Sequence, residues 1–377
     1  MSRPSGIATC FARCALHAVE IVFWISLAGL VWTHALYPVA AVLLAKAAPR
    51  RVRAGDMEPT VAVIVTAYNE EASIARRIEN LLALDYPRDK LQIVITDDAS
   101  TDRTAAIALE FPGVVVVPNP KGGKVAAQDR AVRQTDAEIV AFTDANATWA
   151  PDALRKLVRP FADPDVAYVT GRLNILAPDG SNREGVYWRY EMVVRDAESR
   201  LGSVTGGNGS IYALRRPDYT EVDSRFGHDL SLPYLMVQHG RRAVFEPAAN
   251  AYEKPTATNE AEYGRKVRMF EHCWLIVLRG KMLRRLGPVY WVEIVSHRLL
   301  RYASGLLHVA LLATSIALVT HGWFYDAVLA AQLALFAAAL IGIGIARYYV
   351  LVSWATVVAL VNYLRRGVPA TWEPIRE

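Results

Sequence analysis

Several short polar motifs in this sequence follow apolar runs, and their residue types suit work on a phosphate-bearing substrate. Asp144 and Asn146, separated by one residue, follow the apolar run 139–143. An Asp-x-Asp pair at such a place holds a divalent cation, because hard oxygen ligands suit Mg²⁺ or Mn²⁺ and the metal bridges a diphosphate. An amide replaces the second carboxylate here, which lowers the expected metal affinity. A plain turn is the alternative, since Asn and Asp are common in turns.

Two further motifs place carboxylates where a substrate could meet them. Asp97 and Asp98 follow the apolar run 91–96, and adjacent carboxylates at a strand end can accept hydrogen bonds from a base and from ribose hydroxyls. The alternative is the N-cap of a following helix, formed within 100–102. Asp229, beside His228, can take a proton from an attacking hydroxyl group, or it can cap a helix. Both interpretations stay open when each motif is taken alone.

Glycine-rich and basic segments add candidate contacts to phosphate and sugar. The segment 121–124, Lys-Gly-Gly-Lys, precedes a helix, whose N-terminus offers N–H groups to a phosphate while Lys124 adds charge. It contains no Walker A motif. The glycine-rich segment 206–210 leaves room for a sugar ring, and a tight turn is the alternative for both segments. Arg265 and Arg268 share one face of a helical stretch and suit phosphate or lipid head groups.

The elements that must position these motifs alternate between strand and helix. Short β-branched runs predict strands, and apolar residues at helical spacing predict helices between them. The predicted strands are 61–65, 91–96, 114–117 and 139–143, and the predicted helices are 74–82, 103–109 and 124–134. This alternation indicates a doubly wound parallel sheet, which binds ligands at the carboxyl ends of its strands. Three of those ends carry the polar clusters 68–70, 97–98 and 144–146.

The two ends of the 377-residue chain are apolar, which predicts a membrane protein. The run 19–45 is long enough to cross a bilayer and too long for the apolar core of a signal peptide. Basic residues within 46–53 outnumber those before the run, so we expect the following domain in the cytosol. The runs 306–319, 327–345 and 348–364 are further candidate spans, after an amphipathic, interfacial stretch at 288–301. Three spans would place the C-terminus outside, whereas Arg365 and Arg366 favour the opposite orientation.

Composition excludes several function classes. The net charge of +5 comes without a basic stripe interleaved with aromatic residues, which argues against nucleic-acid binding. Three cysteines provide neither a disulfide framework nor a zinc cluster.

Taken in order along the chain, these motifs resemble the inverting family 2 glycosyltransferases. The resemblance spans roughly 61–274 and is strongest to the membrane-integrated synthases of cellulose, hyaluronan or poly-N-acetylglucosamine. It implies an α/β fold of the GT-A type, a Rossmann-like, doubly wound mixed sheet with transmembrane helices at both ends. The expected organisation is a tail at 1–18, a transmembrane helix at 19–45, a cytosolic catalytic domain at 58–275, interfacial helices at 276–302, about three transmembrane helices within 303–364 and a tail at 365–377. Such a protein lies in the cell (inner) membrane and crosses it several times.

The resemblance also implies a role for each matching residue. Asp229 matches the catalytic base, and Asp144 with Asn146 matches the site of Mg²⁺ or Mn²⁺. The residues that match donor contacts are Ala67, Tyr68, Glu70, Asp97, Asp98, Lys124, Asp144, Arg265 and Arg268. The residues assigned to the acceptor side are Gly207, Asn208, Gly209, Ser210, His228 and Trp274.

Three departures from the family pattern bear on function. Asn146 stands where relatives have Asp, and His228 stands where they have Glu or Asp. In the family's Gln-x-x-Arg-Trp motif, Arg265 replaces Gln and Met269 replaces Trp. That tryptophan would stack on the acceptor sugar, so its absence argues against processive extrusion, although Trp274 lies five residues further on and is a candidate substitute.

The resemblance finally implies the partners. They are a nucleotide-sugar donor, with UDP-N-acetylglucosamine or UDP-glucose as candidates, a glycan or lipid acceptor in polysaccharide synthesis, and the lipid bilayer. A homo-oligomer or an accessory export subunit is a further expectation. The rival activity is a non-processive transfer of one sugar to a polyprenyl phosphate or another lipid. A transporter or scaffold with a degenerate transferase domain is disfavoured, because the run 327–345 has almost none of the ionisable or helix-breaking residues that transporters carry.

Overall fold

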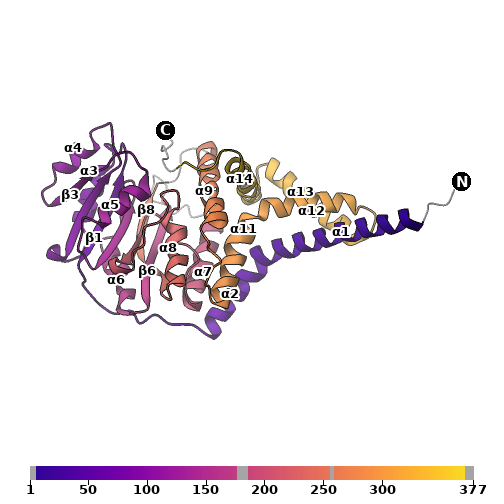
Figure 1. Ribbon diagram of the computed structural model, residues 1–377, viewed down its shortest axis with the longest axis horizontal. Helices are drawn as coiled ribbons and strands as arrows, with labels where there is room; N and C mark the ends of the chain where they lie inside the picture. Colours follow the sequence, from indigo (N-terminus) through magenta and orange to yellow (C-terminus); the bar gives the residue numbers. More distant parts are fainter. Residues whose placement is uncertain (1–5, 176–185, 255–258, 370–377) are drawn as a thin grey trace. The chain divides into compact units, whose positions relative to one another are not determined.

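The computed structural model describes residues 6–175, 186–254 and 259–369 (Figure 1). The predicted tails 1–18 and 365–377 therefore lie partly outside the described residues. The chain divides into two compact units. The sheet unit comprises 41–261, 275–293 and 367–377, and the helical unit comprises 1–40, 262–274 and 294–366.

The sheet unit is built on one mixed sheet of eight strands. The strands are β1 (Val61–Ala67), β2 (Leu91–Asp97), β3 (Val114–Pro118), β4 (Ile139–Asp144), β5 (Thr148–Trp149), β6 (Val166–Ile175), β7 (Tyr212–Arg215) and β8 (Arg242–Glu253). Their order is β3-β2-β1-β4-β7-β6-β8-β5. The first four are parallel, β7 is antiparallel to both β4 and β6, β8 is parallel to β6, and β5 is antiparallel to β8. The mixed α/β sheet expected from the sequence is confirmed.

Strand β1 shows why these residues form a central strand. Val61, Val63 and Val65 point into one apolar core, whereas Ala62 and Ile64 point into the core on the opposite face. All five are fully buried, as expected for the continuous apolar run of a strand that is covered on both faces.

Helices cover both faces of this sheet. Helices α3 (Ile74–Leu82), α4 (Thr104–Leu109) and α6 (Ala153–Val158) contribute to the first core. Helices α5 (Lys124–Val132), α7 (Val186–Leu201) and α8 (His228–Gln238) contribute to the second. In α3, Ile74, Ile78 and Leu81 are buried at helical spacing and anchor the helix. The sheet unit also contains the short helix α10 (Pro288–Glu293).

The helical unit contains the apolar segments from both ends of the chain. Its elements are α1 (Gly6–Val31), η1 (Trp32–Leu36), η5 (Ile294–Leu299), α11 (Leu300–Tyr302), α12 (Ser304–Ala317), α13 (Trp323–Leu340) and α14 (Gly344–Arg366), with the larger part of α9 (Asn259–Arg279). Helix α2 (Tyr37–Ala47) continues from η1 across the boundary between the units.

Three helices among the described residues are long and apolar enough to cross a membrane. They are Cys14–Ala47, Trp323–Leu340 and Gly344–Arg366. The pair Pro288–Tyr302 and Ser304–Ala317, bent by 64°, passes the same criteria when taken together. The boundary predicted between 345 and 348 is displaced, because Gly342 adopts a left-handed conformation (φ 88°) after the end of α13.

Candidate active site

The carboxyl ends of three neighbouring strands meet at one edge of the sheet. Ala67 of β1 is in register with Asp97 of β2, and Thr66 of β1 is in register with Asp144 of β4. The polar clusters that follow these strands in the sequence therefore share one edge, as expected for parallel strands.

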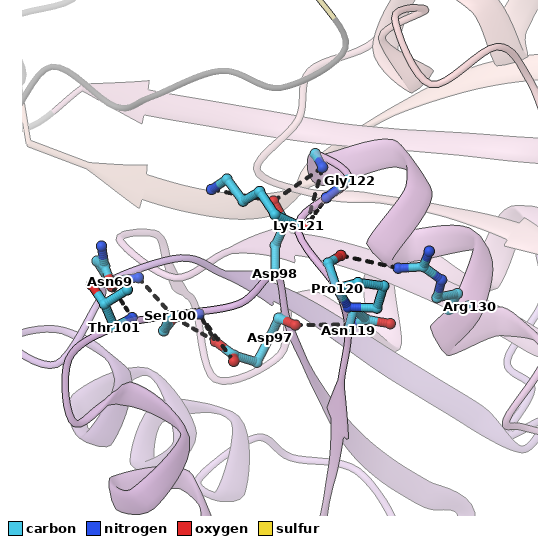
Figure 2. A network of polar contacts seen from close by, with 11 residues as sticks. Asn69, Asp97, Asp98, Ser100, Thr101, Asn119, Pro120, Lys121, Gly122 and Arg130 are labelled. Atoms are coloured by element: carbon cyan, nitrogen blue, oxygen red, sulfur yellow. Dashed lines mark hydrogen bonds and ion pairs between the residues drawn. The ribbon is translucent and has the colours of Figure 1, made fainter.

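Asp98 shapes the glycine-rich turn before α5 (Figure 2). Its carboxylate accepts hydrogen bonds from the backbone N–H groups of Gly122 (2.8 Å) and Gly123 (3.1 Å to each oxygen), and Lys121 Nζ lies 3.5 Å from Oδ2. The residue is only 3% exposed. Asp98 thus holds the turn, which differs from the direct contact with a nucleotide that the sequence resemblance implied.

Asp97 holds the neighbouring loop in the same way. Its carboxylate accepts hydrogen bonds from the backbone N–H and the hydroxyl of Ser100. Asn69, with a left-handed backbone (φ 55°), receives a hydrogen bond from Thr101 N at 2.7 Å and links β1 to this loop (Figure 2). Asp97 therefore also holds a local turn.

A half-exposed aromatic surface lies beside these loops. The ammonium group of Lys121 lies over the ring of Tyr68, and both side chains remain partly accessible. Glu70 accepts a hydrogen bond from Ser73 Oγ at 2.5 Å, which fixes the start of α3, and Ala67 is buried at the strand end. Among the residues at the end of β1 that were predicted to contact the donor, Tyr68 thus has a ring that a ligand can reach.

Lys124 is the centre of the charged cluster at the end of β4. Its ammonium group forms an ion pair with Asp144, and the two side chains are 26% and 30% exposed. Burial lowers the pKa of Lys124, but the charges of Asp144, Asp229 and Glu253 raise it above its ordinary value. Lys124 is therefore protonated at neutral pH, with three carboxylates close enough to act on it.

The glycine-rich loop forms one side of this cluster. A Cβ atom at Gly209 would lie 3.3 Å from Lys124 Nζ and 3.4 Å from Asp144 Oδ2, so glycine keeps the charged pair open. Ser210 Oγ donates a hydrogen bond to Glu253, and the Asn208 side chain forms hydrogen bonds within the fold to Thr170, Gly171, Ser210 and Ile211.

The backbone of the loop is tied to the start of α8. Gly207 N donates to the carbonyl oxygen of Asp229 at 2.6 Å. A Cβ atom at Gly207 would lie 2.1 Å from the Tyr168 hydroxyl, so the loop approaches β6 too closely for any larger residue.

Asp229 lies in the first turn of α8 and is half-exposed. Gly227 leaves space for its carboxylate, because a Cβ atom there would lie 2.6 Å from Oδ1. Its neighbour His228 is 4% exposed, and Nδ1 lies 3.0 Å from the Tyr212 hydroxyl. Burial, with a smaller effect of Lys124, lowers the pKa of His228 to about 3, so the ring is neutral. His228 thus supports the helix from the core, whereas the sequence placed it on the acceptor side.

Two residues that the sequence did not single out belong to this site. Glu253, the last residue of β8, brings a further carboxylate to the cluster. Arg77 of α3 is 1% exposed and lies beneath the cluster, where Asp144 and Glu253 both act on its charge. Neither residue belongs to a recognisable motif. The sequence marks Glu253 only as a glutamate at the end of a β-strand, and it carries no pattern that would indicate a role for Arg77.

Arg77 is part of a network that joins β4 to the glycine-rich loop. Its Nη2 donates to Thr143 Oγ1 at 2.7 Å, and Thr143 Oγ1 donates to the carbonyl oxygen of Ser210 at 2.8 Å. Trp149 Nε1 donates to the same carbonyl oxygen at 2.9 Å, and the guanidinium group lies 5.2 Å from the centre of the Trp149 ring.

Three predicted residues lie in the helical unit instead. Arg265 pairs with Glu262 at 2.9 Å on α9, and Arg268 is half-buried on the same helix. Trp274 is 8% exposed and donates to the carbonyl oxygen of Thr356 at 2.9 Å. The Trp274 ring is thus packed among helices, which differs from its suggested role as a stacking surface for sugar.

The predicted metal residues offer few ligands on their own. Asn146 is exposed, and Asp144 is paired with Lys124. Within the described part of the chain, no group of three or more His, Cys, Asp or Glu side chains lies close enough to hold a metal ion. A cation at Asp144 would therefore need ligands from a substrate.

Comparison with known sequences identifies the domain that carries this cluster. Residues 62–219 match the sequence profile described as Glycosyl transferase family 2. The chain contains a family 2 glycosyltransferase domain. The matched residues include Asp98, Lys124, Asp144 and the glycine-rich loop, so this part of the cluster lies within the family 2 domain, whereas Asp229 and Glu253 lie beyond the match.

Curated relatives of this domain are named as a glycolipid synthase and as a sugar transferase. A "Beta-monoglucosyldiacylglycerol synthase" of Synechocystis sp. is 33% identical over 213 residues, which covers 51% of this chain and 43% of that protein. An "N-acetylglucosaminyltransferase" of Azorhizobium caulinodans is 30% identical over 223 residues, which covers 52% of this chain and 55% of that protein. The chain thus spans about half the length of the curated relatives it matches.

A solved structure matches almost the entire chain. A mannosyltransferase from Pyrobaculum calidifontis, in complex with GDP-Man and Mn²⁺, superposes with a TM-score of 0.73. The match covers 93% of this chain and 99% of that one at 24% identity. The likeness confirms the GT-A type of fold that the sequence predicted for the family 2 domain.

Proposed function

We propose that this chain is an inverting glycosyltransferase that moves a sugar from a UDP-linked donor to a glycan or lipid acceptor. The observation that carries the proposal is the ion pair between Lys124 and Asp144, with Asp229 and Glu253 acting on the same ammonium group. A protonated lysine suits a diphosphate, and a carboxylate on the same cluster suits the removal of a proton.

The reaction is a direct displacement. The acceptor hydroxyl attacks C1 of the sugar while the Asp229 carboxylate accepts its proton. The bond between C1 and the diphosphate oxygen breaks in the same step, so the anomeric configuration inverts. Lys124 stabilises the negative charge that develops on the departing diphosphate. His228 is neutral and buried, so it takes no part in the proton transfer.

Asp144 and Asn146 would hold a divalent cation, Mg²⁺ or Mn²⁺. Mg²⁺ is commonly bound by one or two carboxylates together with substrate phosphates and water, which fits the small number of protein ligands here. The open space beside Asp144 Oδ2, kept by Gly209, fits the approach of such an ion. When bound, the cation supplies neutralising charge to the diphosphate.

For the nucleotide we propose a position against Tyr68, at the ends of β1 and β2. The Tyr68 ring is half-exposed, and Lys121 lies over it. Asp98 acts on this site through the turn 121–124 that it holds, and Asp97 acts through its own loop.

A second candidate activity is the transfer of a single sugar to a lipid. Two observations favour it: Met269 stands at the position of the family's stacking tryptophan, and one relative is named after a diacylglycerol glycolipid. Incubation with a labelled donor separates the two, because single transfer gives one product of fixed size and polymerisation gives a ladder.

We further propose that the apolar helices cross the inner membrane and leave the sheet unit in the cytosol. The basic residues that follow the first apolar helix, Lys46, Arg50, Arg51 and Arg53, support this orientation. A homo-oligomer or an accessory export subunit remains a prediction from the sequence.

Asp229→Asn is the direct test of the proposed base. The variant should lose transfer while binding the donor nearly as well as the native protein, because the amide keeps the shape and removes the basic oxygen. Asp136→Asn, at a fully exposed carboxylate, is the matched control and should behave as the native protein. Released nucleotide is measured with a panel of nucleotide sugars, with and without Mg²⁺ or Mn²⁺. Substantial turnover by Asp229→Asn would remove Asp229 from the role of base.

A further inference from the structure

Two π-helical segments pack against each other inside the helical unit. Segment η1 contains Trp32 and Thr33, and segment η5 contains Ser296. Trp32 Nε1 donates to Ser296 Oγ at 2.8 Å, and Thr33 Oγ1 donates to the Ser296 carbonyl oxygen at 2.6 Å. π-Helical turns are rare and occur frequently at functional sites. The side chains of two such segments in direct contact are therefore candidates for a functional site.

Four basic side chains converge on this contact, which we call the basic cluster: His34, His297, Arg301 and His308. Arg301 Nη1 lies 3.1 Å from His297 Nε2, and the charges of the other three members all act on His34. The cluster is drawn from η1, η5, α11 and α12. Segments far apart in the sequence thus bring one guanidinium group and three imidazole rings together.

Hydroxyl groups complete the basic cluster. His34 Nε2 lies 3.0 Å from Ser304 Oγ, and His308 Nε2 lies 2.8 Å from the hydroxyl of Tyr349 on α14. Both histidine rings meet the Tyr349 ring edge to face, with centres 5.2 and 5.5 Å apart. The site therefore offers both positive charge and neutral hydrogen-bond donors.

The basic cluster can be reached from outside the helices. His297 and Ser304 are buried, whereas His34, Arg301 and His308 are half-exposed. Among the described residues, His308 Nδ1 is buried without a hydrogen-bond partner. A buried polar atom without a partner costs free energy, and a ligand that bonds to it would recover that cost.

The surroundings of the basic cluster are apolar. His34 lies within the candidate membrane span Cys14–Ala47, and Tyr349 lies within the candidate span Gly344–Arg366. Leu36 and Val309, near His34 and His308 in sequence, are 53% and 51% exposed. Ionisable side chains in such helices are rare and costly, and they mark sites where a ligand is bound or carried.

We infer that the basic cluster binds the head group of a lipid that ends in a phosphate monoester. Guanidinium groups match phosphate oxygens with directed hydrogen bonds, and histidine and tyrosine add further donors. A phosphate monoester presents three terminal oxygens as hydrogen-bond acceptors, which suits a site with one guanidinium group and several imidazole and hydroxyl donors. The exposed apolar side chains near the cluster suit the hydrocarbon chains of the same molecule.

The test compares two lipids that differ only in the phosphate. The full-length protein in phosphatidylcholine nanodiscs is titrated with phosphatidic acid and with diacylglycerol of the same chains. Phosphatidic acid should bind saturably, and diacylglycerol should bind at least about tenfold more weakly, as expected when charge-assisted hydrogen bonds are lost. Equal binding of the two lipids would overturn the inference without any need for a variant.

Variants then assign the binding to the basic cluster. Arg301→Gln and His308→Gln should each weaken the binding of phosphatidic acid, while Arg301→Lys should keep part of it because the charge remains. Arg347→Gln, at an exposed arginine on α14, is the control and should bind as the native protein. Unchanged affinity in both Arg301→Gln and His308→Gln would show that the lipid binds elsewhere.

Inorganic phosphate distinguishes a lipid site from a site for a soluble anion. Phosphate should compete with phosphatidic acid only at much higher concentration, because it lacks the hydrocarbon chains. Equal affinity for the free ion and the lipid would overturn the lipid assignment. Donor-dependent release of nucleotide, measured on the same samples, reports on the sheet unit, so loss of lipid binding and loss of transferase chemistry remain separate results.

Discussion

The buried guanidinium of Arg77 provides a sharp test of how the active-site charges are set. Burial lowers the pKa of Arg77 to about 9, although Asp144 and Glu253 raise it. Arg77 is therefore still protonated at pH 7, beneath the carboxylates of Asp144 and Glu253. We expect Arg77→Met to leave a folded protein whose carboxylates are harder to ionise.

The expected change in stability is small because two effects oppose each other. The fall of the pKa from 12.5 to about 9 corresponds to about 5 kcal/mol of unfavourable free energy for the buried charge. Methionine removes that cost, but it leaves Thr143 Oγ1 without this donor, at about 1–3 kcal/mol, and it removes one of the two hydrogen bonds to Asn80 Oδ1, at about 0.5–1.5 kcal/mol. The free energy of unfolding should therefore change by no more than about 3 kcal/mol, in line with replacements of other buried charges by apolar residues.

Activity should respond more strongly than stability. Loss of the positive charge makes nearby carboxylates harder to ionise, so the acid limb of the pH–rate profile should move to higher pH by about one unit, and kcat measured at a pH on that limb should fall about tenfold. Arg77→Lys keeps the charge and should restore the acid limb, although a single ammonium group cannot reproduce both hydrogen bonds. The profile is measured by nucleotide release across pH, and unfolding is followed thermally on the same preparations.

Arg76→Met is the matched control, since Arg76 precedes Arg77 on α3 and is exposed. It should leave the pH–rate profile and the stability unchanged. An Arg77→Met protein that is folded and has the native pH–rate profile would refute the electrostatic role. A stability loss far above the stated limit would refute the account of the buried charge.

Three further changes test the packing and the loops of the sheet unit. Gly207→Ala should lower the free energy of unfolding by about 1–3 kcal/mol, because its Cβ would overlap the Tyr168 hydroxyl, and Tyr168→Phe in the same protein should recover part of the loss in thermal unfolding. Burial raises the pKa of Asp129 to about 6, so the stability that its protonated form gives the fold is lost as pH rises from about 4 to 6. Asp129→Asn should flatten this pH dependence and raise the free energy of unfolding by up to about 3 kcal/mol at pH 7. Asp98→Asn should raise the KM for the nucleotide sugar about tenfold with a smaller effect on kcat, because an amide cannot accept all the N–H groups that the carboxylate holds. An unchanged KM would mean that the turn keeps its shape without this carboxylate.

The elements of the sheet unit were predictable because local patterns and tertiary environment agree. The run 61–65 is β-branched and apolar, and it becomes a strand buried on both faces. Asp98 and Asp144 were recognisable because they follow such strands directly. Their partners were not, since nothing local says that the Asp98 carboxylate turns toward Gly122 and Gly123.

The residues that escaped prediction are those whose role depends on packing alone. Arg76 and Arg77 are adjacent and chemically identical, yet one is exposed and the other is buried under the active site. His228 lies beside the proposed base in sequence, but the turn into α8 directs its ring into the core. The π-helical segments η1 and η5 have no sequence signature, because they arise from contact between two distant parts of the chain.

The reversed direction of β7 has a consequence for how this domain can change its substrates. Because β7 runs antiparallel to β4, with Tyr212 opposite Phe142, the segment that precedes β7 arrives at the same edge where β4 ends. A parallel strand would have delivered that segment to the opposite edge. On the proposed function this segment forms one wall of the sugar site, so its residues other than the closely packed Gly207 can change while the strand pairing stays intact. Exchange of 202–206 between relatives, with Gly207 and Gly209 kept, is therefore the route that we expect to a new sugar preference in this scaffold.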